Sequence, residues 1–199
     1  MNFDKKINPQ IYLKNPFEVA TEYLLGAYLC SVTDGKLTIG KITEVEVYIG
    51  AEDKASHAYK NKLTKRTATM FKKGGCAYVF FVYGMYNQFN VVVSEEGNPN
   101  AILIRALEPI DGIEFMQERC NCPNLKNLTT GPGKLCQAMG ITKSEHDGIN
   151  LCSDKIWISP KTQNYEYVSA KRVGIDYAQE YKDKLWRFYI KNSNFISVK

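Results

Sequence analysis

The chain has 199 residues, of which 44% are hydrophobic and 24% are charged, and its net charge is +5. These values are typical of a soluble globular protein of one domain, and they exclude a disordered chain and a strongly cationic, histone-like protein. Neither an apolar run of the ~18 residues that a membrane-spanning helix needs nor an apolar segment after Met1 is present, so we expect no transmembrane helix and no signal peptide.

The helices are predicted from capping residues. The first is predicted over residues 15–26, with Asn15 as the N-cap and Pro16 at the first helical position. A second helix is predicted to start with Asp111 as its N-cap. A third, short helix is predicted within residues 131–140, where a glycine-rich loop precedes it and a glycine ends it.

Strands are predicted where β-branched and aromatic residues form short runs between turn residues. They cover residues 28–33, 36–49, 77–83, 90–94, 100–107, 156–159, 165–170, 185–190 and 195–198. Asp34 and Gly35 are expected to form the tight turn between the first two. Because most strands return without a crossover helix, we predict an α+β fold, a single mixed domain over residues 1–199 with a largely antiparallel sheet.

The cysteines and histidines do not favour a metal site. The chain has six cysteines and two histidines, but no Cys-x2-Cys pair. The cysteine density is also too low for a disulfide scaffold at this length. We therefore predict reduced cysteines, a reducing compartment and no bound metal.

The excess positive charge lies in one segment. Residues 60–73 contain six basic residues, Lys65 and Arg66 among them, and no acid, whereas the rest of the chain is close to neutral. Such a patch can bind a polyanion, because each phosphate contact releases a condensed counterion. A solvated lysine-rich loop would give the same pattern, so the charge alone leaves both alternatives open.

Two glutamates and a tyrosine recur at alternate positions in the strand predicted over residues 36–49. Strict alternation places Ile42, Glu44, Glu46 and Tyr48 on one face of the sheet and the residues between them on the other. Two carboxylates this close could act as an acid/base pair in glycosidic cleavage. A strand with a solvated polar face has the same pattern, and the spacing does not tell which glutamate would act.

Arg105 is the most anomalous residue, because it interrupts the apolar run of residues 101–107. An unpaired buried charge is costly, so we expect an ion pair with Glu46 or Glu44, or a bound phosphate. The loop at residues 131–134 could offer backbone N–H groups and a lysine to an anion. That loop is not a Walker A motif and does not indicate nucleotide hydrolysis.

Several motifs, in this order along the chain, resemble those of the alkyladenine DNA glycosylase family, the 3-methyladenine DNA glycosylases of the human and bacterial type. They lie at residues 43–48, 55–57, 70–71, 74–90, 104–109, 131–138, 171–175 and 185–190. The match covers nearly the whole chain. The resemblance implies one domain built around a curved, largely antiparallel β-sheet with flanking helices.

The resemblance also implies an activity. Enzymes of this family act in base-excision repair: they flip damaged purines out of duplex DNA and hydrolyse the N-glycosidic bond with a glutamate-activated water, leaving an abasic site. The implied substrates are 3-methyladenine, 7-methylguanine, hypoxanthine and ethenoadenine, and no metal or organic cofactor is implied. We expect a monomer whose partner is double-stranded DNA, without membrane association, in the bacterial cytoplasm and associated there with the nucleoid.

Catalytic roles follow from the resemblance. Glu46 matches the general base that activates the attacking water, and Arg105 matches an arginine that helps to hold this water. The backbone carbonyl of Val173 is the third expected contact of the water. Neutral lesions would also need acid assistance at the purine, and the sequence does not identify that acid.

The substrate-binding and DNA-binding roles are implied in the same way. Tyr48 matches the residue that stacks on one face of the flipped base, and His57 and Phe80 match those on the other face. Asn90 matches the residue that excludes normal guanine, and Tyr83 the residue that fills the gap left by the flipped nucleotide. The residues expected at the DNA-facing surface are Tyr83, Met85, Tyr86, Leu103, Lys65, Arg66 and Lys134.

Two other functions stay open at this point. A nucleosidase for free purine nucleosides could use the same base and aromatic walls, but it would not need the basic segment or Tyr83. A non-catalytic lesion-binding or nucleic-acid-binding protein would not need Glu46 together with Arg105. Catalysis on a duplex substrate would discriminate among the three functions.

Overall fold

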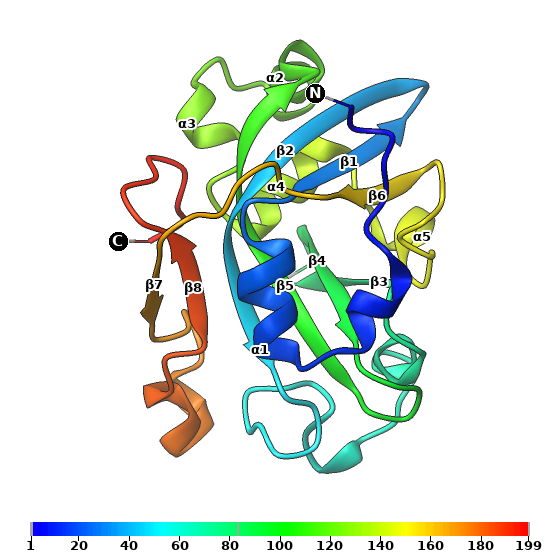
Figure 1. The fold of residues 1–199 in the computed structure, drawn as a ribbon, viewed down its shortest axis with the longest axis vertical. Helices are drawn as coiled ribbons and strands as arrows, with labels where there is room; N and C mark the ends of the chain where they lie inside the picture. Colours follow the sequence, from blue (N-terminus) through cyan, green and yellow to red (C-terminus); the bar gives the residue numbers. More distant parts are fainter. Residues whose placement is uncertain (1, 83, 199) are drawn as a thin grey trace.

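The fold is seen in Figure 1, a computed structural model that describes residues 2–82 and 84–198. Its strands are β1 (Tyr28–Thr33), β2 (Lys36–Tyr48), β3 (Ala77–Val82), β4 (Tyr86–Val93), β5 (Asn100–Asp111), β6 (Ile156–Ser159), β7 (Tyr167–Ala170) and β8 (Arg187–Ile190). They form one sheet in the order β3-β4-β5-β2-β1-β6, and β8 pairs with both β2 and β7. All these described pairs are antiparallel.

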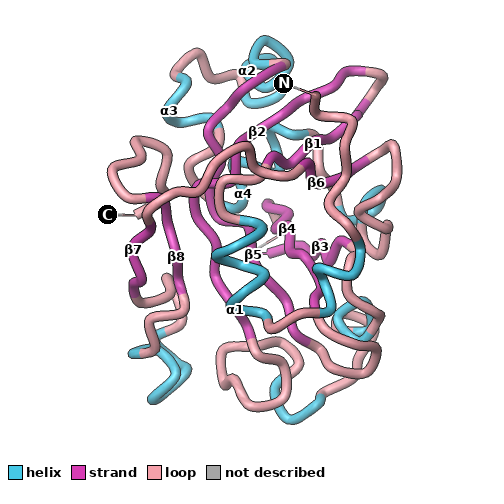
Figure 2. The backbone as a smooth tube through the Cα atoms, viewed as in Figure 1, coloured by secondary structure: helices cyan, strands magenta, loops and turns pink. Residues whose placement is uncertain are grey.

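Short helices flank this sheet and connect its strands. They are η1 (Pro9–Leu13), α1 (Pro16–Glu18), η2 (Val19–Leu24), η3 (Tyr59–Asn61), η4 (Ala68–Phe71), α2 (Ile113–Cys120), α3 (Leu125–Leu128), α4 (Pro132–Met139), α5 (Lys143–His146) and η5 (Asp176–Asp183). Figure 2 shows the strands running through the middle of the molecule with helices and long loops around them. The predicted α+β fold around a curved, largely antiparallel sheet is confirmed.

One face of the sheet carries the main apolar core. Ile42, Val45 and Val47 of β2 pack there with Ile102 and Ile104 of β5. Leucines of η2 and α4 complete the same cluster, so these helices cover that face of the sheet. The residues that alternate with these apolar ones have side chains on the opposite face of the sheet.

A β-bulge in the middle of the sheet decides which side chains reach that opposite face. The pairing of β2 with β5 steps past Thr43 on one strand and past Arg105 on the other. A bulge inserts one extra residue and reverses the alternation beyond it. The prediction that Ile42 shares a face with Glu44 is therefore wrong, because Ile42 lies in the apolar core with Val45.

The first predicted helix begins where expected but is not α-helical throughout. The side chain of Asn15 accepts a hydrogen bond from the N–H of Phe17 at 2.9 Å, as expected for an N-cap. After α1 the chain continues as the π-helix η2 and leaves helical geometry at Leu25. The helix is thus shorter and more widely wound than the predicted 15–26.

The start of α2 and the C-terminal segment also differ from prediction. Strand β5 continues through Asp111, so Gly112 rather than Asp111 occupies the N-cap of α2, with a positive φ of 66°. Residues 195–198 do not form the predicted strand. Their polar groups bind side chains instead: Thr43 donates to the carbonyl of Phe195, and the N–H of Ser197 donates to Glu44.

The remaining predictions about composition can be compared with the same structure. The six cysteines are free thiols, and Cys30, Cys76 and Cys136 are buried. Among residues 2–82 and 84–198, no three His, Cys, Asp or Glu side chains gather as a metal ion would require. No helix in those two ranges is both long enough and apolar enough to cross a bilayer.

Candidate active site

A cavity of about 580 Å³ opens on the face of the sheet opposite the main apolar core. Side chains from β2, β3, β4 and β5 line it, together with residues of the loops at 55–57 and 173–177. The structure brings eight of the predicted site residues to this cavity: Tyr48, His57, Arg66, Phe80, Asn90, Leu103, Arg105 and Val173. Residues from distant parts of the chain therefore converge on one hollow.

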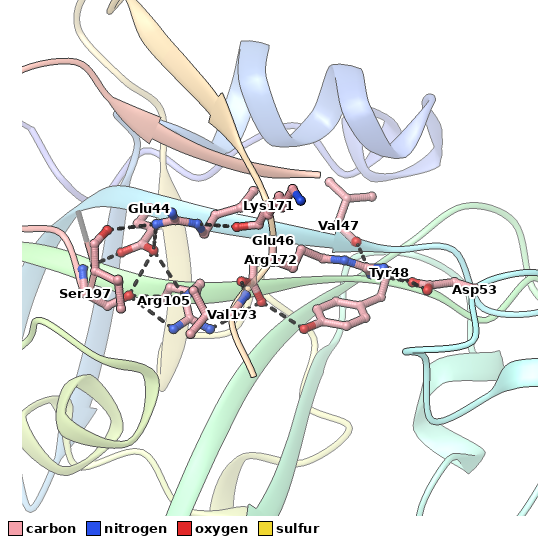
Figure 3. A network of polar contacts seen from close by, with 12 residues as sticks. Glu44, Glu46, Val47, Tyr48, Asp53, Arg105, Lys171, Arg172, Val173 and Ser197 are labelled. Carbon is pink, nitrogen blue, oxygen red and sulfur yellow. Dashed lines mark hydrogen bonds and ion pairs between the residues drawn. The ribbon is translucent and has the colours of Figure 1, made fainter. Parts of the chain in front are cut away.

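Glu46 lies behind the wall of this cavity, and its carboxylate is held by three groups (Figure 3). Its side chain is fully buried. One oxygen accepts the backbone N–H of Val173 at 2.7 Å, and the other accepts the hydroxyl of Tyr48 at 2.8 Å. Nη1 of Arg105 lies 3.3 Å from the second oxygen. All three partners are donors, which matches the acceptor-only chemistry of an ionised carboxylate.

Glu44 does not enter the cavity but holds a second, adjoining network. Its Oε1 atom accepts from Nε of Arg105 at 3.2 Å, Nη1 of Arg187 at 2.9 Å and the hydroxyl of Ser197 at 2.9 Å. The side chain of Glu44 is fully buried. The expected ion pair of Arg105 is confirmed, and it involves both glutamates, since Arg105 bridges Glu44 and Glu46.

A third buried acid holds the ring of Tyr48 indirectly. Arg172 and Asp53 form an ion pair whose two side chains are completely buried. The Arg172 guanidinium lies 4.6 Å from the centre of the Tyr48 ring, with the ring of Trp186 5.0 Å away. Burial raises the pKa of Tyr48 well above its usual value, so its hydroxyl keeps the proton that it donates to Glu46.

His57 also lines the cavity and is held by both of its ring nitrogens. Nη2 of Arg66 lies 3.2 Å from Nε2, and the hydroxyl of Tyr78 lies 3.0 Å from Nδ1. Because a guanidinium can only donate, Nε2 must accept, and Nδ1 carries the proton toward Tyr78. The ring of His57 also meets the edge of Phe80, with ring centres 4.5 Å apart. The imidazole is thereby fixed as one neutral tautomer.

The pKa of His57 gives a testable consequence for stability. Burial, reinforced by the nearby charge of Arg66, lowers the pKa of His57 to about 4 from 6.5. Below pH 6.5 the unfolded chain binds a proton that the folded chain does not, so stability falls as the pH falls. Between pH 7 and pH 5 the free energy of unfolding should fall in both proteins. The fall should be about 1–2 kcal/mol smaller for His57→Gln than for the wild type.

Urea unfolding at the two pH values measures this difference, and the range stays above the region where carboxylates titrate. His146 is also buried and has a lowered pKa, so it contributes with the same sign in both proteins. Equal losses in wild type and His57→Gln would show that His57 is not held neutral.

The polar residue Asn90, on β4, is buried in the wall of the cavity. Its Nδ2 atom donates to the backbone carbonyl of Tyr78 at 3.2 Å, which orients the amide. Phe80 is 8% exposed and Leu103 is 4% exposed, so both offer only a small part of their surface to the cavity. The walls are therefore tightly packed.

Of the residues predicted at the DNA-facing surface, Met85, Tyr86, Lys65 and Lys134 do not line the cavity, but each is close in sequence to a residue that does. Phe81, Met85 and Tyr86, around the turn between β3 and β4, are 49%, 66% and 43% exposed. Lys65 and Arg66 are exposed in the basic segment, and Lys134 is exposed at the start of α4, whose Pro132 lines the cavity. The predicted gap-filling residue, Tyr83, lies outside the described residues.

Several residues of the site were not found from the sequence. Asp53 and Arg172 form the buried ion pair beside Tyr48, and Arg187 and Ser197 belong to the network of Glu44. A signal existed for Arg187, because like Arg105 it places a charge in a predicted strand. Val173 was expected to act through its carbonyl, but the contact that the structure shows is its N–H on Glu46.

Comparisons with known proteins show which family this chain is similar to. The family model described as Methylpurine-DNA glycosylase (MPG) matches residues 10–194. A protein of Clostridium novyi (strain NT) named "Putative 3-methyladenine DNA glycosylase" is 47% identical over 203 residues, which cover 98% of this chain and 100% of the relative. Proteins with the same name are 47% identical in Clostridium acetobutylicum, with 97% and 98% covered, and 45% identical in Alkaliphilus oremlandii, with 98% and 100% covered.

Proposed function

This chain belongs to the methylpurine-DNA glycosylase family, and we propose that its cavity receives a damaged purine flipped out of duplex DNA. Membership makes the chain a DNA glycosylase, which is a hydrolase that acts in DNA repair. The proposal adds the mechanism: a water activated by Glu46 attacks the sugar carbon and breaks the N-glycosidic bond, leaving an abasic site. The substrates proposed are 3-methyladenine, 7-methylguanine, hypoxanthine and ethenoadenine.

The observation that carries this proposal is the placement of Glu46. Its carboxylate is oriented by Tyr48, Arg105 and Val173, which all line the cavity. Oε1 accepts the Val173 N–H and retains a second lone pair for a water hydrogen. A general base must come within hydrogen-bond reach of the proton that it abstracts. A water entering between Arg105 and Val173 would meet this requirement.

The walls suit a flat purine. A base in a duplex cannot be reached by a catalytic group, so it must leave the stack at a cost of a few kcal/mol. Aromatic surfaces offset part of that cost, because each base stacked on an aromatic side chain gains about 1–3 kcal/mol. Tyr48, His57 and Phe80 all line the cavity, and we propose that they stack on the two faces of the base. Its volume lies within the ~300–1,000 Å³ usual for ligand sites.

Other features of the proposal concern partners and context. DNA is the partner of a DNA glycosylase, and we propose that the recognised form is a duplex with a damaged purine, bound by a monomer. We further propose that residues 1–199 act as one glycosylase domain without a metal or organic cofactor. The relatives are bacterial proteins, which supports a role on nucleoid DNA in the bacterial cytoplasm.

Activity on a duplex separates this proposal from a nucleosidase and from a non-catalytic lesion-binding protein. A labelled duplex with one hypoxanthine is incubated with protein and EDTA, and abasic sites are then cleaved with hot alkali. Free inosine and an undamaged duplex of the same sequence serve as controls. We expect a break at the hypoxanthine alone and no release from the free nucleoside. Release from inosine only would favour the nucleosidase, and binding without any release, on methylated duplexes as well, would favour the lesion-binding protein.

The basic segment should contribute to DNA affinity through phosphate contacts. Lys62 and Lys65 are exposed in it, so the double variant Lys62→Ala/Lys65→Ala should weaken duplex binding. The slope of log K against log salt concentration should become less steep by about 1–2, because each lost phosphate contact removes about 0.9. Fluorescence anisotropy over a salt series measures this slope.

The control for this test is Lys36→Ala, which removes a lysine at the opposite end of β2, beside the turn at Asp34 and Gly35. Lys36 pairs with Glu118 and is far along the strand from the cavity. Its removal should leave the salt slope unchanged. Equal slopes for the double variant and the wild type would mean that this segment does not contact phosphates.

A further inference from the structure

The segment of residues 195–198 lies against the networks behind the cavity, although it forms no strand. Thr43 donates to the carbonyl of Phe195 at 2.5 Å, and Nη1 of Arg187 donates to the carbonyl of Val198 at 2.9 Å. These two contacts hold the segment on both sides of Ser197. The side chain of Ser197 is therefore brought to a defined place beside Glu44 and Arg105 (Figure 3).

Ser197 connects these two charged residues with both of its polar groups. Its hydroxyl donates to Oε1 of Glu44 at 2.9 Å, and its N–H donates to Oε2 at 2.5 Å. The hydroxyl oxygen accepts from Nε and Nη2 of Arg105, at 3.2 and 3.1 Å. One serine hydroxyl thus accepts hydrogen bonds from one edge of the guanidinium and donates a hydrogen bond to the buried carboxylate.

The other terminal nitrogen of Arg105 faces the reacting part of the site. Nη1 lies 3.3 Å from Oε2 of Glu46, and Arg105 lines the cavity. A guanidinium is planar and its donors form a rigid fork, so fixing one edge fixes the direction of the remaining nitrogen. The edge held by Ser197 therefore determines where Nη1 stands relative to Glu46.

We propose that Ser197 is a positioning residue for excision: its hydroxyl holds the guanidinium of Arg105 so that Nη1 stays on Glu46 at the cavity wall. The inference rests on the proposed function, because it assigns Ser197 a role in the reaction of Glu46. Without the hydroxyl, Nη2 loses the acceptor described above and Nε keeps Glu44. Arg105 would then be less well fixed, while the ion pair that stabilises the fold would persist.

The test measures single-turnover excision of hypoxanthine from duplex DNA together with the dissociation constant of the complex. Ser197→Ala should excise about tenfold more slowly, since small misplacements of catalytic groups cost up to about 100-fold. Its affinity for the duplex should stay within about twofold of wild type. Ser193→Ala is the matched control: Ser193 lies just before this segment, and its hydroxyl accepts from the N–H of Phe195. It should excise at the wild-type rate.

Two further comparisons distinguish positioning from a merely structural role. Ser197→Thr and Ser197→Val have the same shape and differ in the hydroxyl, so only the threonine variant should restore the rate. In an Arg105→Gln background, Ser197→Ala should slow excision no further, because residues that act through one another are not additive. The same slowing in both backgrounds would overturn the inference, as would a wild-type rate for Ser197→Ala.

The outcomes also separate this inference from the proposed function. A wild-type protein that releases no damaged purine would overturn both. A wild-type protein that excises, beside a Ser197→Val variant that excises equally fast, would overturn only the role of Ser197. Thermal unfolding of each variant shows whether a slower rate comes from loss of the folded state.

Discussion

Glu46→Gln is expected to excise damaged purines about 10²–10⁴-fold more slowly than the wild type, which is the usual contribution of a general base. Glutamine keeps the shape of the side chain but cannot take a proton from water at neutral pH. Tyr48, His57 and Phe80 are unchanged in this variant, so a lesion-containing duplex should still bind. Single-turnover kinetics and anisotropy on the same duplex give the two quantities.

The control for this prediction is Glu52→Gln. Glu52 is an exposed glutamate just beyond the end of β2, and the same substitution there removes one charge without touching the cavity. It should excise at the wild-type rate. A wild-type rate for Glu46→Gln would mean that another group activates the water. Loss of duplex binding by Glu46→Gln would mean that the carboxylate serves to recognise the lesion.

Glu44→Ala is expected to cause a large loss of stability. Glu44 is fully buried and binds Arg105, Arg187 and both polar groups of Ser197. Removing one partner of a buried ion pair leaves uncompensated charge and typically costs about 3–5 kcal/mol. At this chain length, 1 kcal/mol corresponds to about 2–4 °C in Tm, so the melting temperature should fall by roughly 6–20 °C.

Glu166→Ala provides the matched comparison, because Glu166 forms an exposed ion pair with Lys191. Exposed pairs contribute about 0–1 kcal/mol, so its melting temperature should change by a few degrees at most. Urea unfolding of both variants reports the free energies directly. Glu44→Gln, which keeps the side-chain volume, provides the measurement if the alanine variant does not fold. If Glu44→Ala lost no more free energy of unfolding than Glu166→Ala, the network around Glu44 would not stabilise the fold as predicted.

The buried charges explain why both predictions concern the same part of the sheet. Glu44, Glu46 and Asp53 are fully buried, and the arginines that they contact are no more than 7% exposed. The three acids are matched by Arg105, Arg172 and Arg187. A balanced set of this kind avoids an isolated buried charge and holds the carboxylate of Glu46, the proposed general base, in a fixed direction.

Much of the fold could be predicted from local sequence. The bounds of β1 and β6 agree with prediction to the residue, because short β-branched runs end at turn residues there. The N-cap at Asn15 was also predictable from its neighbours. The bulge at Thr43 was not, since it arises from the pairing of two strands far apart in sequence, and no local pattern marks it.

The candidate site could be predicted in part. Arg105 was conspicuous as a charge in an apolar strand, and its partners were predictable because two glutamates lie in another strand. The pairing of Glu44 with Ser197 joins residues 153 positions apart, and that of Asp53 with Arg172 joins residues 119 apart. Only the folded chain brings these together. Ser197 carries no signal of its own, since serine is common in exposed loops.

The most direct test of the proposed site is a crystal structure of Glu46→Gln bound to a duplex that contains one hypoxanthine. We predict that the purine lies out of the helix in the cavity, with Tyr48 against one face and His57 and Phe80 against the other. The sugar carbon that is bonded to the purine should then lie next to residue 46, with Arg105 beside it. A purine that remains stacked in the duplex, or that binds at another surface while the cavity stays empty, would contradict the account.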